Sequence, residues 1–393
     1  MITFEEAQKV ISESKFNIST EIVDIKDCLG RFLAEDIFSD INMPPFDKSA
    51  VDGFACRKSD ISNNLEIIEI IQAGSVPVKI VGTNQCSQIM TGAPIPQGAD
   101  TVIMVEDTLE IDNKFVRSKF DSVKQNICFL GEDIKENQLV LEKGISINPA
   151  HIAVMATVGY VNVKVAKKPK VSILSTGNEI IEPYLKPQKS QIRNSNSYQL
   201  IAQIKQSNAI PFYSGIVDDN EKSTYEAIKK AIEVSDIILI TGGVSMGKFD
   251  FVPKILAEIG FDIKFHKISI QPGKPTLFAE YNGKFCFGLP GNPVSTFAIY
   301  ELLVKPLIFK LQGSKLNNKN KRIKMQLGID FNRKNDDRKS FLPVFINDKS
   351  EIIPVDYHGS AHINSLCLAD GLAEIEIGIK FIHKGEFIDV RLF

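Results

Sequence analysis

From residue 169 onward, the pattern of hydrophobic and polar residues predicts buried strands that alternate with helices. Short apolar runs rich in β-branched and aromatic residues occur at 171–174, 210–217, 236–240 and 284–288, and such runs are typical of strands covered on both faces. Apolar residues recur at helical spacing in four further segments: 197–206, 221–234, 250–260 and 294–311. This alternation favours a doubly wound α/β domain over residues 169–316, with a mainly parallel sheet.

The residues on either side of this domain have different patterns. Phe4, Val10 and Ile11 fall on one helical face, and Asn148-Pro149 is a typical start for the apolar helix that follows. Short strand patterns separated by turn-rich loops dominate elsewhere. We therefore expect a multidomain α/β protein whose other parts are an N-terminal helical and linker domain (1–42 and 131–168), a β domain inserted in it (43–130) and a C-terminal β domain (317–393).

Composition and charge narrow the function classes. The 393 residues are 44% hydrophobic and 24% charged, as in ordinary globular proteins, and the net charge of −2 gives no overall attraction to nucleic acid. The six cysteines form no C-x-x-C pair, which is typical of reduced thiols. No apolar run approaches the ~18 residues that span a bilayer, and the start lacks the pattern of a signal peptide. We expect a cytoplasmic protein that binds neither membrane nor nucleic acid.

Three predicted strands end in loops rich in glycine, proline and small polar residues. These loops are Ser175-Thr176-Gly177, Gly242-Gly243-Val244-Ser245 and Leu289-Pro290-Gly291-Asn292. The carboxyl ends of parallel strands meet at one edge of a sheet, where open α/β domains bind ligands. Glycines there can adopt positive φ and expose backbone N–H groups, which favours an anionic ligand. Asn292 is also a good N-cap for the helix that follows.

Charged residues near these loops are candidates for chemistry. Glu179 follows the first strand, and Asp250 precedes a predicted helix, so both carboxylates could hold a divalent cation beside phosphates. The alternatives are a solvated turn carboxylate for Glu179 and an N-cap for Asp250. Lys274, between Gly273 and Pro275, has few acidic neighbours in sequence, which favours contact with a phosphate or oxyanion over a solvated surface position.

A second candidate region lies near the C-terminus. His358 and His362 have i, i+4 spacing, but no Glu or Cys lies at ligand spacing, so a zinc site is not favoured. Ser360, together with Arg338, could bind a small oxyanion; the alternative for both is an ordinary surface loop. The chain has no Walker-type motif and no Ser/His/Asp arrangement, so neither ATPase chemistry nor covalent catalysis is indicated.

Seven short motifs occur in an order that resembles a known family. The motifs are Pro45-Phe46-Asp47-Lys48-Ser49-Ala50-Val51-Asp52-Gly53, Met90-Thr91-Gly92-Ala93-Pro94, Gly131-Glu132-Asp133, Ser175-Thr176-Gly177, Gly242-Gly243-Val244-Ser245, Pro272-Gly273-Lys274-Pro275 and Leu289-Pro290-Gly291-Asn292-Pro293. With these motifs the chain is similar to molybdopterin molybdenumtransferases, the family that includes MoeA and the gephyrin E domain, and the similarity covers nearly its whole length.

The resemblance implies an elongated homodimer of four-domain subunits. The active site would lie between the α/β domain of one subunit and the N-terminal part of the other. Adenylylated molybdopterin and molybdate would be the substrates, molybdenum cofactor and AMP the products, and Mg²⁺ would assist. This is the last step of molybdenum cofactor synthesis, and a transient contact with the adenylyltransferase that makes the substrate is also implied.

The resemblance also assigns roles to individual positions. Lys274 would hold the pterin phosphate, and Arg338 and Ser360 would contact molybdate, while Glu179 and Asp250 would hold Mg²⁺ and the phosphates. The implied catalytic residues are Asp52, Asp133, Glu179, Asp250 and Lys274. Further implied binding positions lie in the same motifs: Thr91, Thr176, Gly242, Gly243, Ser245, Pro272, Gly273, Pro290, Gly291 and Asn292.

The sequence departs from the usual pattern of this family at two positions. Asn178 stands where Asp is usual in the family, and Gln271 stands where many members have Lys, which removes a positive charge near the expected anion.

One rival function is that of the adenylyltransferase that acts one step earlier, but its single domain lacks the 45–53 and 91–94 motifs. The other rival is a non-catalytic dimeric scaffold, which would be favoured if Asp52 and the two candidate metal carboxylates were missing. The choice between molybdate and tungstate stays open.

Overall fold

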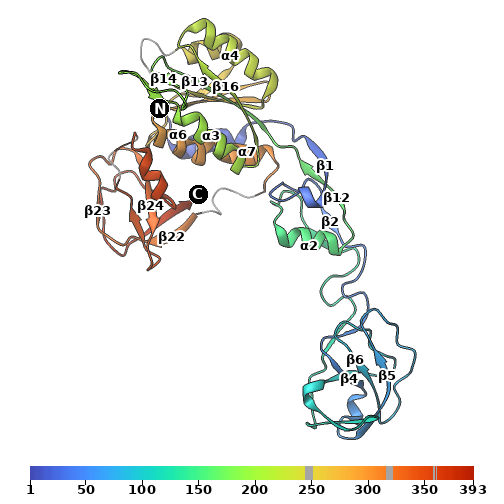
Figure 1. Ribbon diagram of the computed structural model, residues 1–393. Helices are drawn as coiled ribbons and strands as arrows, with labels where there is room; N and C mark the ends of the chain where they lie inside the picture. The colour runs from blue at the N-terminus through green and yellow to red at the C-terminus, as the bar shows by residue number, and fades with distance from the viewer. Residues whose placement is uncertain (244–250, 316–321, 357–358, 360) are drawn as a thin grey trace.

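The computed structural model describes residues 1–243, 251–315, 322–356, 359 and 361–393. Figure 1 shows an α/β domain, a C-terminal β domain beside it and an arm that leads to a second β domain at the far end of the molecule. Among the described residues, no helix combines the length and the apolar character that crossing a bilayer requires.

The α/β domain is built on a six-stranded sheet with the order β16-β13-β17-β21-β20-β18. The first four strands are parallel, whereas β20 and β18 run antiparallel to their neighbours. The doubly wound sheet predicted from the sequence is therefore confirmed, with an antiparallel edge that the pattern did not indicate. The strands are β13 (Lys170–Thr176), β16 (Ile210–Val217), β17 (Ile237–Thr241), β18 (Asp262–Phe265), β20 (Leu277–Tyr281) and β21 (Lys284–Leu289).

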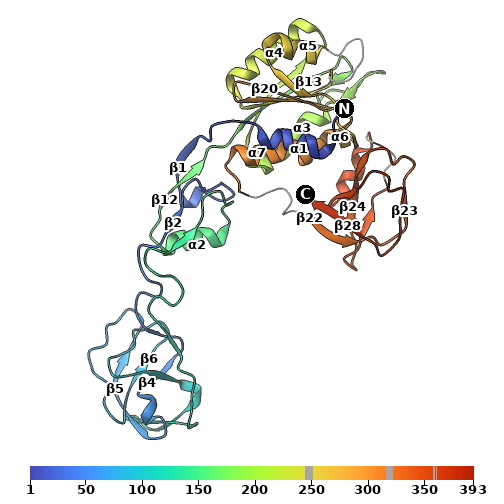
Figure 2. The same ribbon diagram turned by 180° about the vertical axis from the view of Figure 1, so that it is seen from behind.

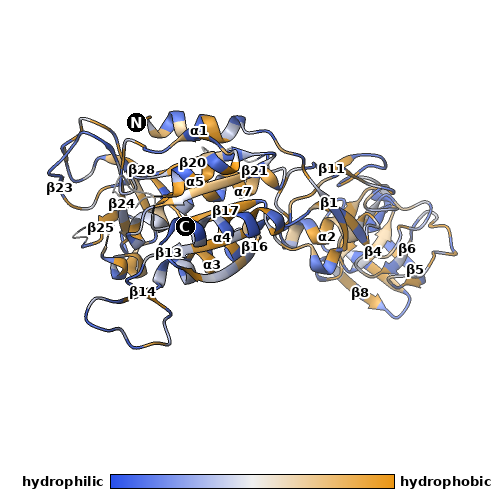
Figure 3. Cartoon of the chain, turned by 90° about the horizontal axis from the view of Figure 1, so that it is seen from above, coloured by the Kyte–Doolittle hydropathy of each residue, from blue (hydrophilic) through white to orange (hydrophobic). Residues whose placement is uncertain are grey.

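Helices cover both faces of this sheet. Helices α4 (Glu221–Val234) and α5 (Val252–Ile259) pack on one face. The other face carries α3 (Ser195–Gln206) and a long helical segment that starts at Pro293. In Figure 3, hydrophobic colouring is concentrated in the central strands, as expected for strands that are buried on both faces. The long segment consists of α6 (Pro293–Ile299), one π-helical turn (Tyr300–Val304) and α7 (Lys305–Leu311).

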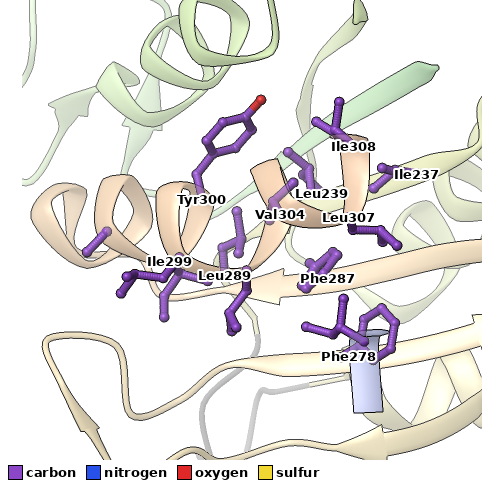
Figure 4. Packing of buried hydrophobic residues seen from close by; sticks show 14 of the residues in the cluster. Ile237, Leu239, Phe278, Phe287, Leu289, Ile299, Tyr300, Val304, Leu307 and Ile308 are labelled. Atoms are coloured by element: carbon purple, nitrogen blue, oxygen red, sulfur yellow. The ribbon is translucent and has the colours of Figure 1, made fainter. Parts of the chain in front are cut away.

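The long helical segment supplies much of the core. Figure 4 shows Val304 and Leu307 packed near the strand residues Leu239 and Phe287, and all four are fully buried. Burial of each such side chain stabilises the fold by about 1.5–3 kcal/mol. Tyr300 is also fully buried, and its hydroxyl forms a 2.8 Å hydrogen bond with the hydroxyl of Ser207, which satisfies the polar end of the ring.

The first 42 residues differ from their predicted helical structure. Only α1 (Phe4–Glu13) is an α-helix, and it packs against α7 and the α/β core rather than in the arm (Figure 2). After it come β1 (Thr20–Asp24), a 3₁₀ turn and β2 (Ile37–Phe38). Short apolar runs do not distinguish helix from strand by periodicity, and here pairing with residues more than a hundred positions away selects the strands.

Two pairs of antiparallel strands build the arm. Strand β1 pairs with β12 (Asn162–Ala166), and β2 pairs with β11 (Leu139–Leu141). Helix α2 (Pro149–Thr157) packs against them and begins at the predicted Asn148 cap, whose side chain accepts a hydrogen bond from the His151 amide. The chain therefore leaves the α/β domain along β1 and returns along β12.

The β domain at the end of the arm is a six-stranded sheet with the order β7-β4-β6-β5-β9-β8. It has two small hydrophobic clusters of its own and a separate short pair, β3 (Lys48–Ser49) with β10 (Ile127–Cys128). The sheet strands are β4 (Gly53–Cys56), β5 (Asn64–Ile71), β6 (Gln85–Ile89), β7 (Thr101–Met104), β8 (Thr108–Asp112) and β9 (Phe115–Ser118).

The C-terminal domain contains a sheet with the order β19-β24-β26-β28-β22. Strand β19 (Ile270–Gln271) belongs to the α/β domain, so this sheet joins the two domains. The other strands are β22 (Arg322–Gln326), β24 (Lys339–Ile346), β26 (Gly371–Ile375) and β28 (Phe387–Leu392), with β25 (Ile352–Pro354) paired to β24.

Three segments that are distant in sequence meet beside β19 in what we call the domain seam. Ile2 forms a parallel bridge with Ile268, and two residues later Ile270 pairs with Lys339 of β24. The ring of Phe4 packs edge-on against Phe341 with centroids 4.8 Å apart. The N-terminus, the α/β domain and the C-terminal domain are therefore held together by backbone pairing and by a continuous apolar core.

A buried ionic cluster closes this seam. The Lys339 side chain is 5% exposed, and its Nζ lies 2.7 Å from carboxylate oxygens of Glu5 and Glu376 and 3.4 Å from Glu374. Burial disfavours the charged form of Lys339, but its hydrogen bonds to Glu376 and Glu5 outweigh burial and raise its pKa. Three cations balance three carboxylates in this Lys339 cluster: Lys339, Arg322 and Arg391 with Glu5, Glu374 and Glu376.

Replacing Lys339 by Met should therefore destabilise the protein. Glu374, whose side chain is 2% exposed, keeps Arg322 and Arg391 but loses the Lys339 charge, and Glu5 and Glu376 lose their hydrogen bonds to the ammonium group. Loss of a hydrogen bond to a charged group costs about 1.5–3 kcal/mol. Urea unfolding followed by circular dichroism measures the loss. Lys324→Met, at an exposed position of β22, is the matched control and should change stability by less than about 0.5 kcal/mol. Equal stability of the two variants would contradict the role of the cluster.

Candidate active site

The carboxyl ends of β13, β17 and β21 lie side by side and form what we call the strand-exit edge. Ser175 pairs with Thr241, and Thr241 pairs with Leu289. Strand β13 is followed by β16 on one side of it, and the chain then crosses to β17 on its other side. The edge between β13 and β17 is therefore the topological switch point, where open α/β sheets form their ligand crevice.

Tight glycine turns shape this edge. Gly242 has a φ of +89° and Gly243 a φ of +63°, so both adopt the left-handed conformation. A Cβ atom on Gly242 would lie 2.2 Å from the Thr176 carbonyl oxygen. The strand exits of β13 and β17 thus approach each other so closely that only glycine fits. The predicted site residues Ser245 and Asp250 belong to 244–250, which lies outside the described residues.

Two buried polar atoms at the edge have no hydrogen-bond partner among the described residues. One is Thr176 Oγ1, which lies close to the Gly242 and Gly243 backbone, and the other is Asn196 Oδ1 at the start of α3. Thr176 is 3% exposed and Asn196 8% exposed. Because an unpaired buried polar atom is costly, these atoms mark a place where a polar ligand would be stabilised.

The loop after β21 is fixed by side chains that bind its carbonyl groups. Asn196 Nδ2 donates to the Gly291 oxygen at 2.8 Å, and Thr296 Oγ1 donates to the Pro290 oxygen at 2.5 Å. The predicted cap Asn292 precedes α6 with an extended backbone, and Pro293 is the first helical residue. The loop is therefore rigid, and it brings a helix start to the strand-exit edge as the sequence predicted.

A network of hydrogen bonds between buried hydroxyl and amide groups lies next to the strand-exit edge. Ser175 Oγ lies 2.7 Å from Ser197 Oγ and 2.9 Å from Thr241 Oγ1. Asn194 donates to Tyr213, whose hydroxyl in turn donates to Glu182. Burial, and then this bond to a carboxylate, raise the pKa of Tyr213, so the ring remains a neutral donor. The network links the ends of β13 and β17 to the start of α3 and to the middle of β16.

Lys274 lies on a constrained loop between the α/β and C-terminal domains. The Gln271–Pro272 peptide is cis, and Gly273 has a φ of +112°. A Cβ on Gly273 would lie 2.5 Å from Ile299 of α6, so this loop is packed against the helix that starts at the strand-exit edge. The Lys274 side chain is exposed, and among the described residues it forms no ion pair. It is therefore available to an anionic ligand.

A groove of about 750 Å³ lies between this loop and the C-terminal domain. Gln271 and Ser340, which pair across the domain seam, line it together with Arg333 and Lys334. The Arg333 guanidinium donates to three backbone carbonyl groups, whereas Lys334, also on this wall, is exposed and forms no ion pair with the residues that the structure describes. Arg333, Lys334 and Ser340 were not found from the sequence. The basic loop before β24 could be seen in the sequence. The sequence does not show that this loop lies opposite Gln271 in the folded chain.

The remaining predicted residues of this half are placed less centrally. Glu179 lies on the exposed loop just after β13, close to Gly177, whose Cβ would meet its carboxylate. Arg338 donates from Nη1 to the Ile270 oxygen at 3.4 Å and lies 3.5 Å from Asp337, so it supports the seam beside the groove. Ser360 and His358 lie outside the described residues. In the described part of the chain, no three His, Cys, Asp or Glu side chains form a metal-binding group.

The predicted N-terminal residues lie elsewhere in the chain. Asp52 accepts hydrogen bonds from the amide (2.6 Å) and hydroxyl (2.7 Å) of Thr91, and these bonds lower the pKa of its carboxyl group. Asp133 is exposed where the chain re-enters the arm, with its amide bonded to the Met43 carbonyl. Figure 1 places the β domain that carries Asp52 and Thr91 far from the strand-exit edge. Within one chain, Asp52 and Thr91 are therefore bonded to each other, but this pair lies far from the strand-exit edge and the Lys274 loop.

Comparison with known proteins covers the whole chain. Residues 2–159 match the MoeA N-terminal region (domain I and II), residues 172–310 match a probable molybdopterin binding domain, and residues 324–393 match the MoeA C-terminal region (domain IV). The molybdopterin molybdenumtransferase of Staphylococcus epidermidis is 36% identical over all of this chain and 95% of its own length. That of Bacillus subtilis is 35% identical over all of this chain and 94% of its own.

Solved structures agree with these sequence matches. The molybdopterin biosynthesis MoeA protein of Pyrococcus horikoshii superimposes with a TM-score of 0.86 at 30% identity and covers 100% of both chains. A molybdenum cofactor biosynthesis protein from Pyrococcus furiosus, 21% identical, shares the fold over 100% of both chains with a TM-score of 0.63. The multidomain arrangement is thus that of MoeA proteins.

The glycine turn at the strand-exit edge gives a direct test. Gly242→Ala should lower stability by about 1–3 kcal/mol, because the new Cβ meets the Thr176 backbone in a strained conformation. Gly291→Ala, in the neighbouring loop, has no atom within 4 Å of the new Cβ and should change stability by only a few tenths of a kcal/mol. Thermal unfolding of the two variants measures the difference, and similar melting temperatures would show that the close approach is absent.

Proposed function

The chain belongs to the molybdopterin molybdenumtransferase family, and on this premise we propose that it inserts molybdenum into adenylylated molybdopterin and releases AMP. Its relatives carry that name over the full length of this chain, including the N-terminal and C-terminal regions. The adenylyltransferase alternative accounts only for the α/β domain. The scaffold alternative gives no reason for the buried unpaired polar atoms at the strand-exit edge.

The observation that carries this proposal is the strand-exit edge itself. Glycine turns with exposed backbone groups, a helix start and the exposed cation of Lys274 suit a ligand with several phosphate oxygens. Thr176 and Asn196 offer buried polar atoms to the same ligand. The constrained loops bind and orient the substrate, and positioning of this kind accelerates a transfer without a protein nucleophile.

Glu179 and Asp250 are the residues that would hold Mg²⁺. Carboxylate oxygens are the donors that Mg²⁺ prefers, and Glu179 presents one beside Gly177, just after the end of β13. When bound there, the ion would neutralise charge on the phosphates as the bond to AMP breaks. Lys274, on the loop between β19 and β20, would contact the phosphates separately from this ion.

Molybdate, as a substrate, would bind in the groove of the domain seam. Gln271 and Ser340 offer neutral hydrogen-bond donors, and Lys334 offers a cation. Arg338 would act through the backbone, because its guanidinium contacts the Ile270 carbonyl just before Gln271. Molybdate would therefore be held mainly by neutral donors at this position.

A homodimer would complete the site. Asp52 and Thr91 form a preorganised pair, yet the arm holds them far from the strand-exit edge of their own chain. A second subunit in the opposite orientation would bring its β domain, and Asp133 at the start of the arm, towards the Lys274 loop. The same proposal places the reaction in the cytoplasm, with the adenylyltransferase as a transient partner.

The decisive experiment measures AMP release from adenylylated molybdopterin with Mg²⁺, in the presence and absence of molybdate. We expect molybdate-dependent release, and in Lys274→Gln a rise in KM of about ten- to hundredfold from the lost charged hydrogen bond. Lys230→Gln, on the exposed side of α4, is the control and should behave as the wild type. Tight binding of the substrate without any release of AMP would instead favour the scaffold.

Restoring a cation at position 271 tests the molybdate site. Gln271→Lys should lower the molybdate concentration at half-maximal AMP release by about fivefold, the effect of roughly 1 kcal/mol from one added charge beside an oxyanion. Gln206→Lys adds the same charge at an exposed position near the end of α3 and should leave this concentration unchanged. An unchanged value in both variants would remove molybdate from this groove.

A further inference from the structure

A second basic pocket lies at the opposite edge of the α/β sheet. It has a volume of about 670 Å³ and is lined where β13 and β21 begin, at Lys170 and Lys284. Strand β13 runs from Lys170 to Thr176, so about 20 Å of strand separate this pocket from the strand-exit edge. Nothing in the proposed transfer reaction uses it.

Lysines from two segments that are distant in sequence line this pocket. Lys15 precedes β1, Lys167 and Lys168 follow β12, and Lys170 begins β13. In the described part of the chain, none of these four lysines forms an ion pair. The local excess of positive charge contrasts with the whole protein, whose net charge is −2.

The other charged groups that line the pocket are already engaged. Asp236 is the single carboxylate among its lining residues, and its Oδ2 accepts the Lys170 amide at 2.7 Å. The Lys284 ammonium donates to carbonyl groups at the end of α4, including Ser235 at 2.9 Å. Lys170 Nζ also lies 6.0 Å from the centroid of the Phe212 ring. The four lysines therefore outnumber the single lining carboxylate, Asp236, and leave the pocket with an excess of positive charge.

We propose that this pocket is a binding site for a small, multiply phosphorylated anion. Its volume is that of a typical small-molecule site. Lysine ammonium groups bind phosphate oxygens as mobile point charges, and four of them suit a ligand with several negative groups. Asn17 and Asn282, which also line the pocket, supply neutral donors. Nucleic acid would need a longer basic stripe than this local cluster provides.

Because of where this site lies, a bound ligand would hold the arm in place relative to the sheet. Lys15 lies where the chain leaves the α/β domain for the arm, and Lys167 and Lys168 lie where it returns. Lys167 is already bonded through its amide to the Ser19 carbonyl, so the two crossings run together here. A bound anion would tie both crossings to the β20–β21 turn and stiffen the arm, which carries Asp52 and Thr91, relative to the sheet.

Isothermal titration calorimetry with inorganic tripolyphosphate at physiological salt tests the site. We expect saturable binding to the wild-type protein, and binding weaker by about tenfold or more in Lys167→Gln/Lys168→Gln because two charge-assisted contacts are lost. Lys229→Gln/Lys230→Gln removes the same charge from adjacent exposed positions on α4 and should change the affinity by less than twofold. Circular dichroism confirms that both variants are folded.

Three results would overturn the proposal. The first is absence of saturable binding to the wild type, and the second is an equal loss in the two double variants, which would show only general electrostatic attraction. The third is a loss in Lys274→Gln with full binding in Lys167→Gln/Lys168→Gln, which would place the anion at the strand-exit edge. A hexaglutamate peptide that binds more tightly than tripolyphosphate would likewise overturn it, in favour of an acidic protein partner. None of these results depends on AMP release, so the proposed transferase reaction is tested separately.

Discussion

The structure depends on the short parallel pairing of Ile270–Gln271 with Lys339–Ser340 at the domain seam. This pairing is too short to hold two domains by itself, and the buried Lys339 cluster supplies the rest. One ammonium group satisfies carboxylates from α1, β26 and the segment after β26, so it joins the N-terminus to the C-terminal domain. Buried ion pairs add little net stability over apolar packing, but they tolerate no misplacement of either partner. The cluster therefore fixes where the C-terminal domain sits more than how strongly it is held.

That fixed position matters because the seam and the candidate site share a loop. Gln271 pairs with the C-terminal domain, Gly273 packs against Ile299 of α6, and the next residue, Lys274, is exposed. The anion site proposed at the strand-exit edge and the oxyanion groove proposed at the seam thus share one loop. Bringing two anions together is electrostatically unfavourable, and a loop that places neutral donors on one side and a cation on the other reduces that cost.

The arm, in contrast to this loop, keeps two groups of candidate residues apart. It joins the α/β domain through paired strands and a small core, and it carries the Asp52–Thr91 pair to the far end of the molecule. A single chain thus contains both halves of the proposed chemistry but separates them, and the proposed homodimer would bring them together. The basic pocket lies at the point where the arm is attached, so the charge of this pocket and the direction of the arm are physically linked.

The sequence by itself determined the local features. Alternating apolar runs predicted the parallel strands, Asn148 and Asn292 predicted helix starts, and the glycines at 242 and 243 predicted a turn with positive φ, because each depends on a few neighbouring residues. Only the tertiary structure decided the features that depend on distant residues. It turned residues 20–24 into a strand by pairing them with 162–166, placed α1 on the α/β core and made Lys339 a buried centre of charge. The physical reason is that pairing, burial and ion-pair geometry are set by neighbours in space, and no spacing along the chain specifies them.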